Sequence, residues 1–349
     1  MPAYQRSRVK MADIAHESGV SLSTVSLVLS DKPGIPTETR GRVINVARAL
    51  GYQFKNHVIS RSTVNLRTVG LILKSQMGEV PQQNEFYSHV LAGIEAACRQ
   101  QHLNLLFSTL SVDADNFPVE NLHSLWHEAA DGLLLVGAFV DESLNHIIGE
   151  RPCPVVLVDA YSQTPLYDAV LSDNFNGAYR AAEYLIACGH TRIGFVGAHE
   201  HAYPSFLERR RGYLQALHDH GIPTPYFADV KHTTVRSDGI AATINLLQLQ
   251  PGLTALMGVN DIVAISAMHA ALSMGKRIPQ DLSIIGFDDI LLAENVMPPL
   301  TTMQVDKIGM GRLAVNLLLN RAETPQACLV TAVLQPTLIK RMSVQNLPG

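Results

Sequence analysis

Side chains suited to contacting DNA are concentrated between Leu22 and Leu27, near the N-terminus. Hydroxyl groups can hydrogen-bond to phosphate oxygens or base edges, and a leucine can contact the methyl group of thymine. If these residues form a helix in the major groove, Leu22, Ser23 and Leu27 point at base edges. Thr24 and Ser26 are then placed to contact phosphates. Leucine cannot read guanine or adenine by paired hydrogen bonds, so the sequence predicts a half-site recognised through thymine methyl groups and DNA shape.

The neighbouring residues predict a helix-turn-helix that would position this segment. Ile14 and Ala15 lie on one face of a short first helix, and Ala15 is small enough for two helix axes to cross closely. Gly19 can take the positive φ that a three- to four-residue turn requires, and Ser21 is a good N-cap for the second helix. The apolar face of the second helix is supplied by Val20, Val25 and Val28.

An alternative orientation of the second helix must be weighed, in which Leu22 or Leu27 packs inward. Val25, Val28 and Leu29 already fill the inward stripe, which favours the outward orientation. The residues predicted to contact DNA are Lys10, Met11, Ser21, Leu22, Ser23, Thr24, Ser26, Leu27 and Arg61.

The charge of the chain is divided unevenly between its two ends. The net charge is −4, but residues 1–61 carry nine Lys or Arg against four Asp or Glu, a net charge of +5. The remaining residues carry a net charge of −9. A basic N-terminus alone could be a solvated helical face. Together with the helix-turn-helix spacing, it indicates a DNA-facing end joined to an acidic body.

A third helix and then a different pattern follow along the chain. The third helix is expected to open near Pro36 and to end at Gly51, with apolar residues at helical spacing between them. From Val69, short apolar runs alternate with amphipathic segments. The expected strands are 69–73, 103–108, 132–136, 154–158, 169–171, 192–196, 255–258 and 282–286, and the expected helices are 88–100, 176–187, 207–220, 239–247, 261–274 and 308–320.

This alternation predicts an α/β core with doubly wound parallel sheets. The strands are too many for one compact sheet, so we expect two similar lobes. A ligand is then expected at the carboxyl ends of the strands, where open α/β sheets bind ligands. The predicted fold is an all-α helix-turn-helix headpiece followed by a two-lobed α/β core.

Several other classes of protein are disfavoured by the sequence. The four cysteines are far apart, which indicates free thiols in a reducing compartment. The first residues contain no apolar leader, and no apolar run approaches the ~20 residues that span a bilayer, so a cytoplasmic protein is expected. His199-Glu200-His201 has poor spacing for a metal and no third ligand. We therefore expect no metal and no cofactor.

Enzyme and transport functions are the main alternatives to a DNA-binding sensor. The chain has no phosphate-binding GxxxxGK[ST] loop, no GxGxxG after the first strand, no GxSxG and no HExxH. Gly309-Met310-Gly311 lies late in the chain and is better explained by packing. A sugar-binding protein that feeds a transporter would need a leader and would not need the helix-turn-helix. The sequence therefore favours a regulator over an enzyme.

The chain resembles the lactose-repressor (LacI/GalR) family of bacterial transcriptional regulators over nearly its whole length. The resemblance implies a homodimer that reads a near-palindromic operator, with a small effector bound between the lobes of a periplasmic-binding-protein-like core. It also implies a repressor with two states, in which effector binding changes lobe closure and so headpiece affinity. The segments that carry the resemblance are KMADIAHESGVSLSTVSLVLS (10–30), TETRGRVINVARALGY (37–52), DNFNGAYRAAEYLIACGHTRIGFVG (173–197), RRRGYLQAL (209–217), NDIVAISAMHAALSMGKRIPQDLSIIGFDDI (260–290) and PPLTTMQVD (298–306).

The resemblance also divides the chain into domains. Residues 1–52 are expected to form the headpiece and 53–67 a hinge. Residues 68–349 are expected to form the effector-binding and dimerisation core. Its first lobe is expected to contain about 68–165 and 296–328, and its second lobe about 166–295 and 329–349. In the hinge, Phe54 and Arg61 stand where the family usually has a proline and a wedging leucine. Arg61 could enter a minor groove, hold a phosphate or remain solvated, and weaker DNA kinking is expected.

Eight residues match family positions that contact the effector, by position in the motifs. Carboxylates, an amide, a guanidinium and flat rings together suit a polyhydroxylated ligand, so the effector is expected to be a sugar or sugar derivative, or else a nucleoside. Alternatives stay open, because Asp288 or Asp261 could only cap a helix, Arg209 could be solvated and Phe86 could be core. The eight residues are Phe86, Tyr87, Asp159, Tyr203, Ser205, Arg209, Asn260 and Asp288.

Overall fold

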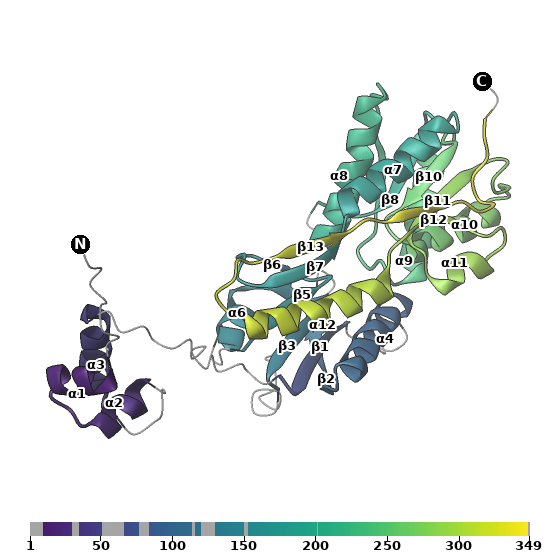
Figure 1. Ribbon diagram of the computed structural model, residues 1–349. Helices are drawn as coiled ribbons and strands as arrows, with labels where there is room; N and C mark the ends of the chain where they lie inside the picture. The colour runs from purple at the N-terminus through teal and green to yellow at the C-terminus, as the bar shows by residue number, and fades with distance from the viewer. Residues whose placement is uncertain are drawn as a thin grey trace. The chain divides into compact units, whose positions relative to one another are not determined.

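The structure, a computed structural model, contains two compact units, Met1–Asn65 and Leu66–Gly349 (Figure 1). The residues that the structure describes are 10–29, 35–50, 66–76, 84–113, 116–119, 130–149, 153–200 and 202–347. No helix in these ranges is long and apolar enough to span a membrane.

The first unit contains the predicted helix-turn-helix and the predicted third helix. They are α1 (Met11–Ser18), α2 (Leu22–Leu29) and α3 (Thr37–Ala49). Gly19 follows α1 with a φ of 67°, the left-handed conformation expected of it. The Ser21 hydroxyl accepts a hydrogen bond from the backbone N–H of Thr24 at 3.1 Å, so the predicted N-cap is confirmed. The buried side chains at the centre are Ile14, Val25, Val28, Val43 and Ala47.

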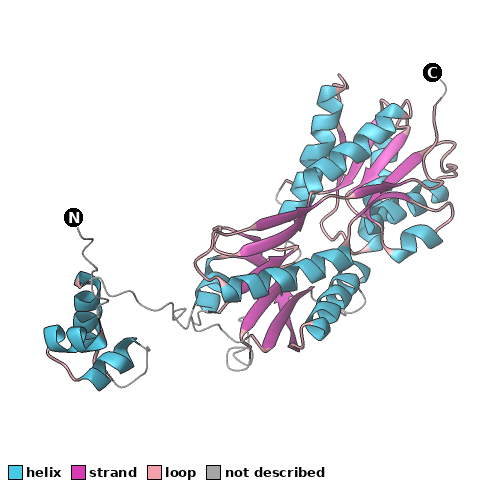
Figure 2. Cartoon of the chain, in the orientation of Figure 1, coloured by secondary structure: helices cyan, strands magenta, loops and turns pink. Residues whose placement is uncertain are grey.

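The second unit is built around two six-stranded sheets (Figure 2). Every pairing in the first sheet is parallel, in the order β13-β7-β5-β3-β1-β2. The second has the order β14-β12-β11-β10-β8-β9 and is parallel except for β14, which runs antiparallel to β12. The strands are β1 (Thr68–Gln76), β2 (Asn104–Val112), β3 (Gly132–Val136), β5 (Val155–Val158), β7 (Asp168–Ser172), β8 (Ile193–Gly197), β9 (Tyr226–Asp229), β10 (Ala255–Gly258), β11 (Ser283–Asp288), β12 (Thr301–Gln304), β13 (Thr331–Leu334) and β14 (Thr337–Ile339), with a small separate pair β4 (Phe139–Val140) and β6 (Tyr161–Ser162).

Helices cover both sheets and define two lobes. We call the first sheet with α4 and α12 the first lobe, and the second sheet with α7, α8, α9 and α10 the second lobe. The helices of this unit are α4 (Glu85–Gln100), α6 (Glu142–Gly149), α7 (Asn174–Ala187), α8 (Pro204–Asp219), α9 (Arg236–Leu249), α10 (Asp261–Ser273), α11 (Leu291–Asn295) and α12 (Lys307–Glu323).

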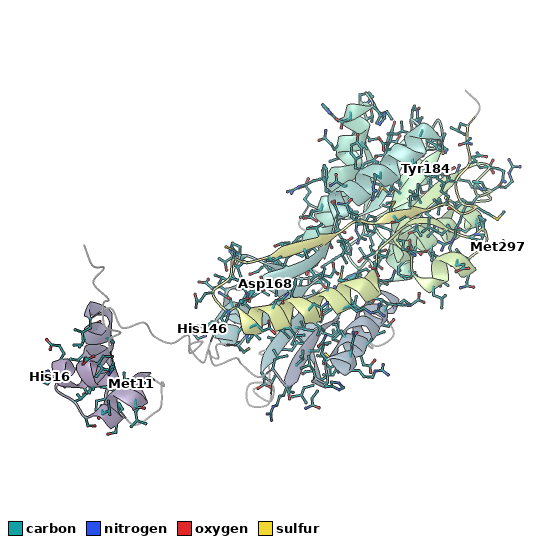
Figure 3. The ribbon with its side chains drawn as sticks, viewed as in Figure 1. Met11, His16, His146, Asp168, Tyr184 and Met297 are labelled. Carbon is teal, nitrogen blue, oxygen red and sulfur yellow. The ribbon has the colours of Figure 1, made fainter. Side chains whose placement is uncertain are left out.

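Glycine permits the closest approach between helices in the first lobe. A Cβ atom at Gly93 of α4 would lie 2.2 Å from the carbonyl oxygen of Ile308, and one at Gly311 of α12 would lie 2.3 Å from that of Val90. Any larger residue would therefore push α4 and α12 apart. At the other end of α12, Arg321 makes two hydrogen bonds, of 2.7 and 2.8 Å, to the carboxylate of Asp168 on β7. Asp168 is labelled in Figure 3.

All eight predicted strands and six predicted core helices are present, with ends shifted by a few residues. The sheets assign three segments differently from the expected lobe boundaries. β7 lies in the first sheet although it falls within 166–295, β12 lies in the second although it falls within 296–328, and β13 lies in the first although it falls within 329–349. An apolar run shows that a strand forms but does not show which of two similar sheets it joins.

Candidate functional site

The carboxyl ends of both parallel sheets carry a connected set of polar side chains. The hydroxyl of Tyr203, just before α8 of the second lobe, lies 3.2 Å from the carbonyl oxygens of both Ala138 and Asp159 in the first lobe. Its single hydrogen can serve only one of them at a time. Tyr161 likewise donates to a carboxylate oxygen of Glu208 on α8, at 3.2 Å. The two lobes are therefore joined by side chains at the edge where open α/β sheets bind ligands.

On the first lobe, the central group is the carboxylate of Asp159, at the end of β5. The Tyr87 hydroxyl donates to it at 3.0 Å, and both side chains are buried. Tyr87 is held in place because Asn84 caps α4 by accepting hydrogen bonds from the backbone N–H groups of Phe86 and Tyr87. Burial raises the pKa of Asp159 to about 6, against the attraction of Lys74 and Arg209. Asp159 is therefore a carboxyl that titrates near neutral pH.

Lys74, at the end of β1, completes this half of the site. Its ammonium lies 5.1 Å from the ring centroid of Tyr87 and 5.3 Å from that of Tyr203. It also donates a hydrogen bond of 2.7 Å to the side-chain oxygen of Asn116. The cation thus contacts rings from both lobes.

On the second lobe, the central group is the guanidinium of Arg209 on α8. Its Nε donates to Asn174 Oδ1 at 2.8 Å, and its Nη1 donates to the carbonyl oxygen of Val259 at 2.8 Å. Its Nη2 lies 2.9 Å from Asp288 Oδ1 in an ion pair, and its Cζ lies 3.8 Å from the ring centroid of Phe287. A planar donor fixed by three partners can present its remaining N–H groups in a defined direction.

Six of the eight residues predicted to contact an effector lie together in this network. Ring contacts, hydrogen bonds and charge interactions connect Phe86 to Tyr87, Tyr87 and Tyr203 to Asp159, and Arg209 to both Asp159 and Asp288. Arg209 is 3% exposed, which rules out the solvated alternative for it. Phe86 is half-buried beside Tyr87, with its ring centroid 5.1 Å from that of Tyr87.

The other two predicted residues are near the same edge but have different surroundings. Ser205 is buried in the first turn of α8. Asn260 caps α10, because its side-chain oxygen accepts from the backbone N–H of Val263 at 2.9 Å. The sequence left capping open for Asp261 and Asp288 and not for Asn260. Asp261 in fact accepts from the Ile290 N–H at 2.9 Å.

Sequence reasoning missed several polar residues of the network. Three of them, Asn174, Asp261 and Lys307, are the first residues of helices that follow strands, which is the positional signal that could have found them. The other three lie within elements, on β1, β6 and α8. Burial and the nearby Asp288 raise the pKa of Asp261 to about 8. The missed residues are Lys74, Tyr161, Asn174, Glu208, Asp261 and Lys307.

In the first unit, the predicted DNA-facing residues lie mostly on the surface. Leu22 is 54% exposed, so the alternative in which it packs inward is wrong, while Leu27 is half-buried. The hydroxyl of Ser21 lies 2.7 Å from that of Ser23 and 2.8 Å from that of Thr24. Lys10, Met11, Ser23 and Ser26 are exposed, and Thr24 is half-buried. The expectations for Phe54 and Arg61 fall outside the residues that the structure describes.

Metal binding finds no support among the residues that the structure describes. No group of three or more His, Cys, Asp or Glu side chains in these ranges could hold a metal ion. His199 and Glu200 lie within the described ranges and His201 lies outside them.

Comparisons with known proteins place the chain in a family. A model described as bacterial regulatory proteins, lacI family, matches residues 10–54, and a periplasmic binding protein-like domain matches residues 182–344. The chain is 32% identical to the ribose operon repressor of Haemophilus influenzae over 97% of this chain and 99% of that one. The chain belongs to the LacI family. Like other members it is a DNA-binding transcriptional regulator with an effector-binding core, and not an enzyme.

Solved structures of other transcriptional regulators share this fold. A family member from Enterococcus faecium with bound ribose has a TM-score of 0.69 and 26% identity, and covers 81% of this chain and all of its own. A complex of the regulator CelR with cellobiose has a TM-score of 0.66 and 25% identity, and covers 96% of this chain and all of its own. A headpiece followed by a two-lobed α/β core is therefore the family architecture.

Proposed function

We propose that this regulator is a homodimeric repressor whose operator affinity is set by a small sugar bound between the two lobes. The observation that carries the proposal is the buried set of Asp159, Arg209 and Asp288 at the carboxyl ends of the sheets. Carboxylates accept hydrogen bonds from sugar hydroxyls, and the guanidinium donates to sugar oxygens. The rings of Phe86 and Tyr87 supply flat apolar faces beside them.

Ribose is the first sugar to test. The relative with 32% identity is named for the ribose operon, and a family structure with 26% identity is titled with bound ribose. The polar groups of this site are numerous and fixed by one another, which suits a ligand with several hydroxyls on a small ring. A nucleoside, which offers a ribose and a flat base, is the second candidate.

The proposed mechanism couples the site to the headpieces through the lobes. Tyr203 and Tyr161 hold one lobe to the other by single hydrogen bonds. A ligand between the lobes shifts the equilibrium between two lobe arrangements only if it binds one of them more tightly than the other. In a homodimer, a change in lobe arrangement alters the spacing of the two headpieces and so their fit to two inverted half-sites. The DNA bound by a bacterial regulator of this kind lies in the cytoplasm.

A mobility-shift titration with the DNA upstream of the gene itself tests the whole proposal. The full chain is titrated alone and with D-ribose, cellobiose or adenosine, and a shift in operator affinity of tenfold or more is expected with one of them. A lower affinity identifies an inducer and a higher affinity a corepressor. If the chain binds a palindromic site specifically and none of these small molecules changes the affinity, the proposed control by a sugar is contradicted.

Two arginine variants test the site itself. Arg209→Met should keep DNA binding but lose the response to the effector, because the guanidinium is the central donor of the second lobe. Arg312→Met, at an exposed position of α12, is the matched control and should respond as the wild type does. Equal responses of both variants would place the effector elsewhere.

The half-site chemistry predicted from Leu22 and Leu27 has its own test. Replacing thymine by uracil across the half-site removes only methyl groups and leaves every hydrogen-bonding atom in place. We expect a loss of affinity at one or more positions. An unchanged affinity at all of them would contradict thymine-methyl recognition.

A further inference from the structure

Lys307, the first residue of α12, has surroundings that the proposed effector contacts do not explain. It is 7% exposed, although an ammonium is costly to bury unless its hydrogen bonds are made. Its ammonium donates to the backbone carbonyl of Asp288 and, at 3.0 Å, to that of Asp289. These carbonyls belong to the second lobe, while α12 packs on α4 and the first sheet. One side chain therefore ties the first lobe to the backbone directly after β11.

The backbone that Lys307 holds has an uncommon conformation. Asp288 has a φ of 112° and Asp289 a φ of 54°, two consecutive residues other than glycine in the left-handed region. Such a conformation persists only where the surroundings fix it. Asp261 fixes the next residue by accepting from the Ile290 N–H. The turn is thus held from the α10 side by a carboxylate and from the α12 side by an ammonium.

The contacts of Lys307 show that it does more than neutralise charge. The carboxylate of Asp289 is already paired with Arg341 at 2.7 Å and accepts from Gln304 at 2.8 Å. Lys307 instead uses two backbone oxygens, which fixes a geometry. Burial lowers the pKa of Lys307, opposed by Asp288 and Asp261. An ammonium that bonds to carbonyls is sensitive to where those carbonyls lie.

Lys307 also reaches the two halves of the proposed site. On one side it supports the backbone that carries the Asp288 carboxylate, which is paired with Arg209. On the other, its ammonium lies 5.9 Å from the ring centroid of Phe86, at the start of α4. Nearby, the Leu292 N–H of the second lobe donates a hydrogen bond of 3.3 Å to a carboxylate oxygen of Glu85, at the start of the same helix.

We infer that Lys307 is a positioning residue that fixes the Asp288–Asp289 turn against α12. In this way it sets how the two halves of the effector site, one on each lobe, are placed relative to each other. Lys307 fixes this turn whether or not a ligand is bound, and only its effect on effector binding rests on the proposed function. Lys307 need not touch the ligand. It sets where Asp288 stands relative to Phe86.

Hydrogen exchange of the ligand-free full chain decides the inference directly. Lys307→Met keeps an unbranched side chain that is one atom shorter and removes the ammonium. We expect exchange in peptides covering residues 286–293 to accelerate by tenfold or more, with the strands β3 and β10 unchanged. Lys340→Met, at an exposed lysine beside the ring of Tyr184, is the matched control and should change neither. Unchanged exchange at 286–293, or equal acceleration throughout both lobes, would overturn the inference.

Binding of D-ribose adds a readout that a purely structural role would not move. If Lys307 acts through Asp288, its replacement should weaken binding about tenfold in the wild type and less than twofold when Asp288→Asn is already present. Equal losses in both backgrounds would contradict the inference. Should the wild type bind no ribose, the sugar proposal fails on that point, while the exchange measurement, made without ligand, still decides the role of Lys307.

Discussion

Replacing Asp159 by asparagine should stabilise the core while impairing effector binding. Burial raises the pKa of Asp159 to about 6, above the value of 3.8 that it has when solvated. A carboxyl whose pKa is higher in the folded chain contributes stability that is fully present below about pH 4 and is lost as the pH rises through about 6. Asparagine resembles the protonated carboxyl and does not titrate, so it escapes this loss.

The size of the effect follows from the two pKa values. The difference between 3.8 and about 6 corresponds to about 3 kcal/mol at pH 7, and roughly 2 kcal/mol of it should appear between pH 4.5 and pH 7. The amide oxygen of asparagine can still accept from the Tyr87 hydroxyl, which donates to Asp159 at 3.0 Å. The advantage of Asp159→Asn over the wild type should therefore grow with pH and level off above pH 7.

Urea unfolding followed by circular dichroism, at half-unit steps from pH 4.5 to 7.5, measures this difference. Asp229→Asn, at an exposed carboxyl on β9, is the control and should show no comparable growth. The stabilised variant should bind the effector more weakly, as expected where a site keeps a costly group for function. A free-energy difference that stays constant with pH, or a variant less stable than the wild type at pH 7, would refute the reasoning.

Two further predictions concern packing and DNA contact. Gly93→Ala should destabilise the core by about 1–3 kcal/mol in urea unfolding, because its Cβ would meet the Ile308 carbonyl, whereas Gly149→Ala, with nothing within 4 Å, should be neutral. Leu22→Ala should weaken operator binding about fivefold to tenfold in a mobility-shift assay yet leave headpiece stability within about 0.5 kcal/mol, since Leu22 is exposed. Val25→Ala, at a buried position, should instead destabilise the headpiece by about 1 kcal/mol or more. Equal melting of the two headpiece variants would contradict the assigned orientation of α2.

The sequence predicted eight of the twelve strands of the two sheets, because each of these is a short apolar run with a distinct boundary, and it missed β9, β12, β13 and β14. The segment 132–136 is an example, since all five residues of β3 are buried. Membership of a particular sheet was harder to predict. β12 and β13 are separated only by α12 and a short connection, yet they join opposite sheets. Local patterns do not contain this information, because the sheet that a strand joins is set by contacts with residues far away in the sequence.

The site residues that match motifs of the resembling family were predicted, and polar residues outside these matches were missed, Lys74 near the end of β1 among them. Asp159 follows β5 and Asp288 ends β11, and both match family positions that contact the effector. Lys307 reaches the same region from a helix that follows the chain crossing between the lobes. Asn260 was indicated by position, but its side-chain oxygen is committed to capping α10.

The polar groups of the site are already partners of one another, and this determines how an effector can act. Tyr203 has one hydroxyl hydrogen for two first-lobe carbonyls, and Arg209 is bonded to Asn174, Val259 and Asp288 within the second lobe. The binding free energy of a sugar is therefore only what its hydroxyls contribute beyond the internal contacts that they replace. Contacts within one lobe persist whatever the lobe arrangement, whereas those of Tyr203 and Lys307 cross between lobes. Because a ligand shifts an equilibrium only by its difference in affinity for the two states, the crossing contacts should govern the response to effector, and the contacts within a lobe should govern affinity.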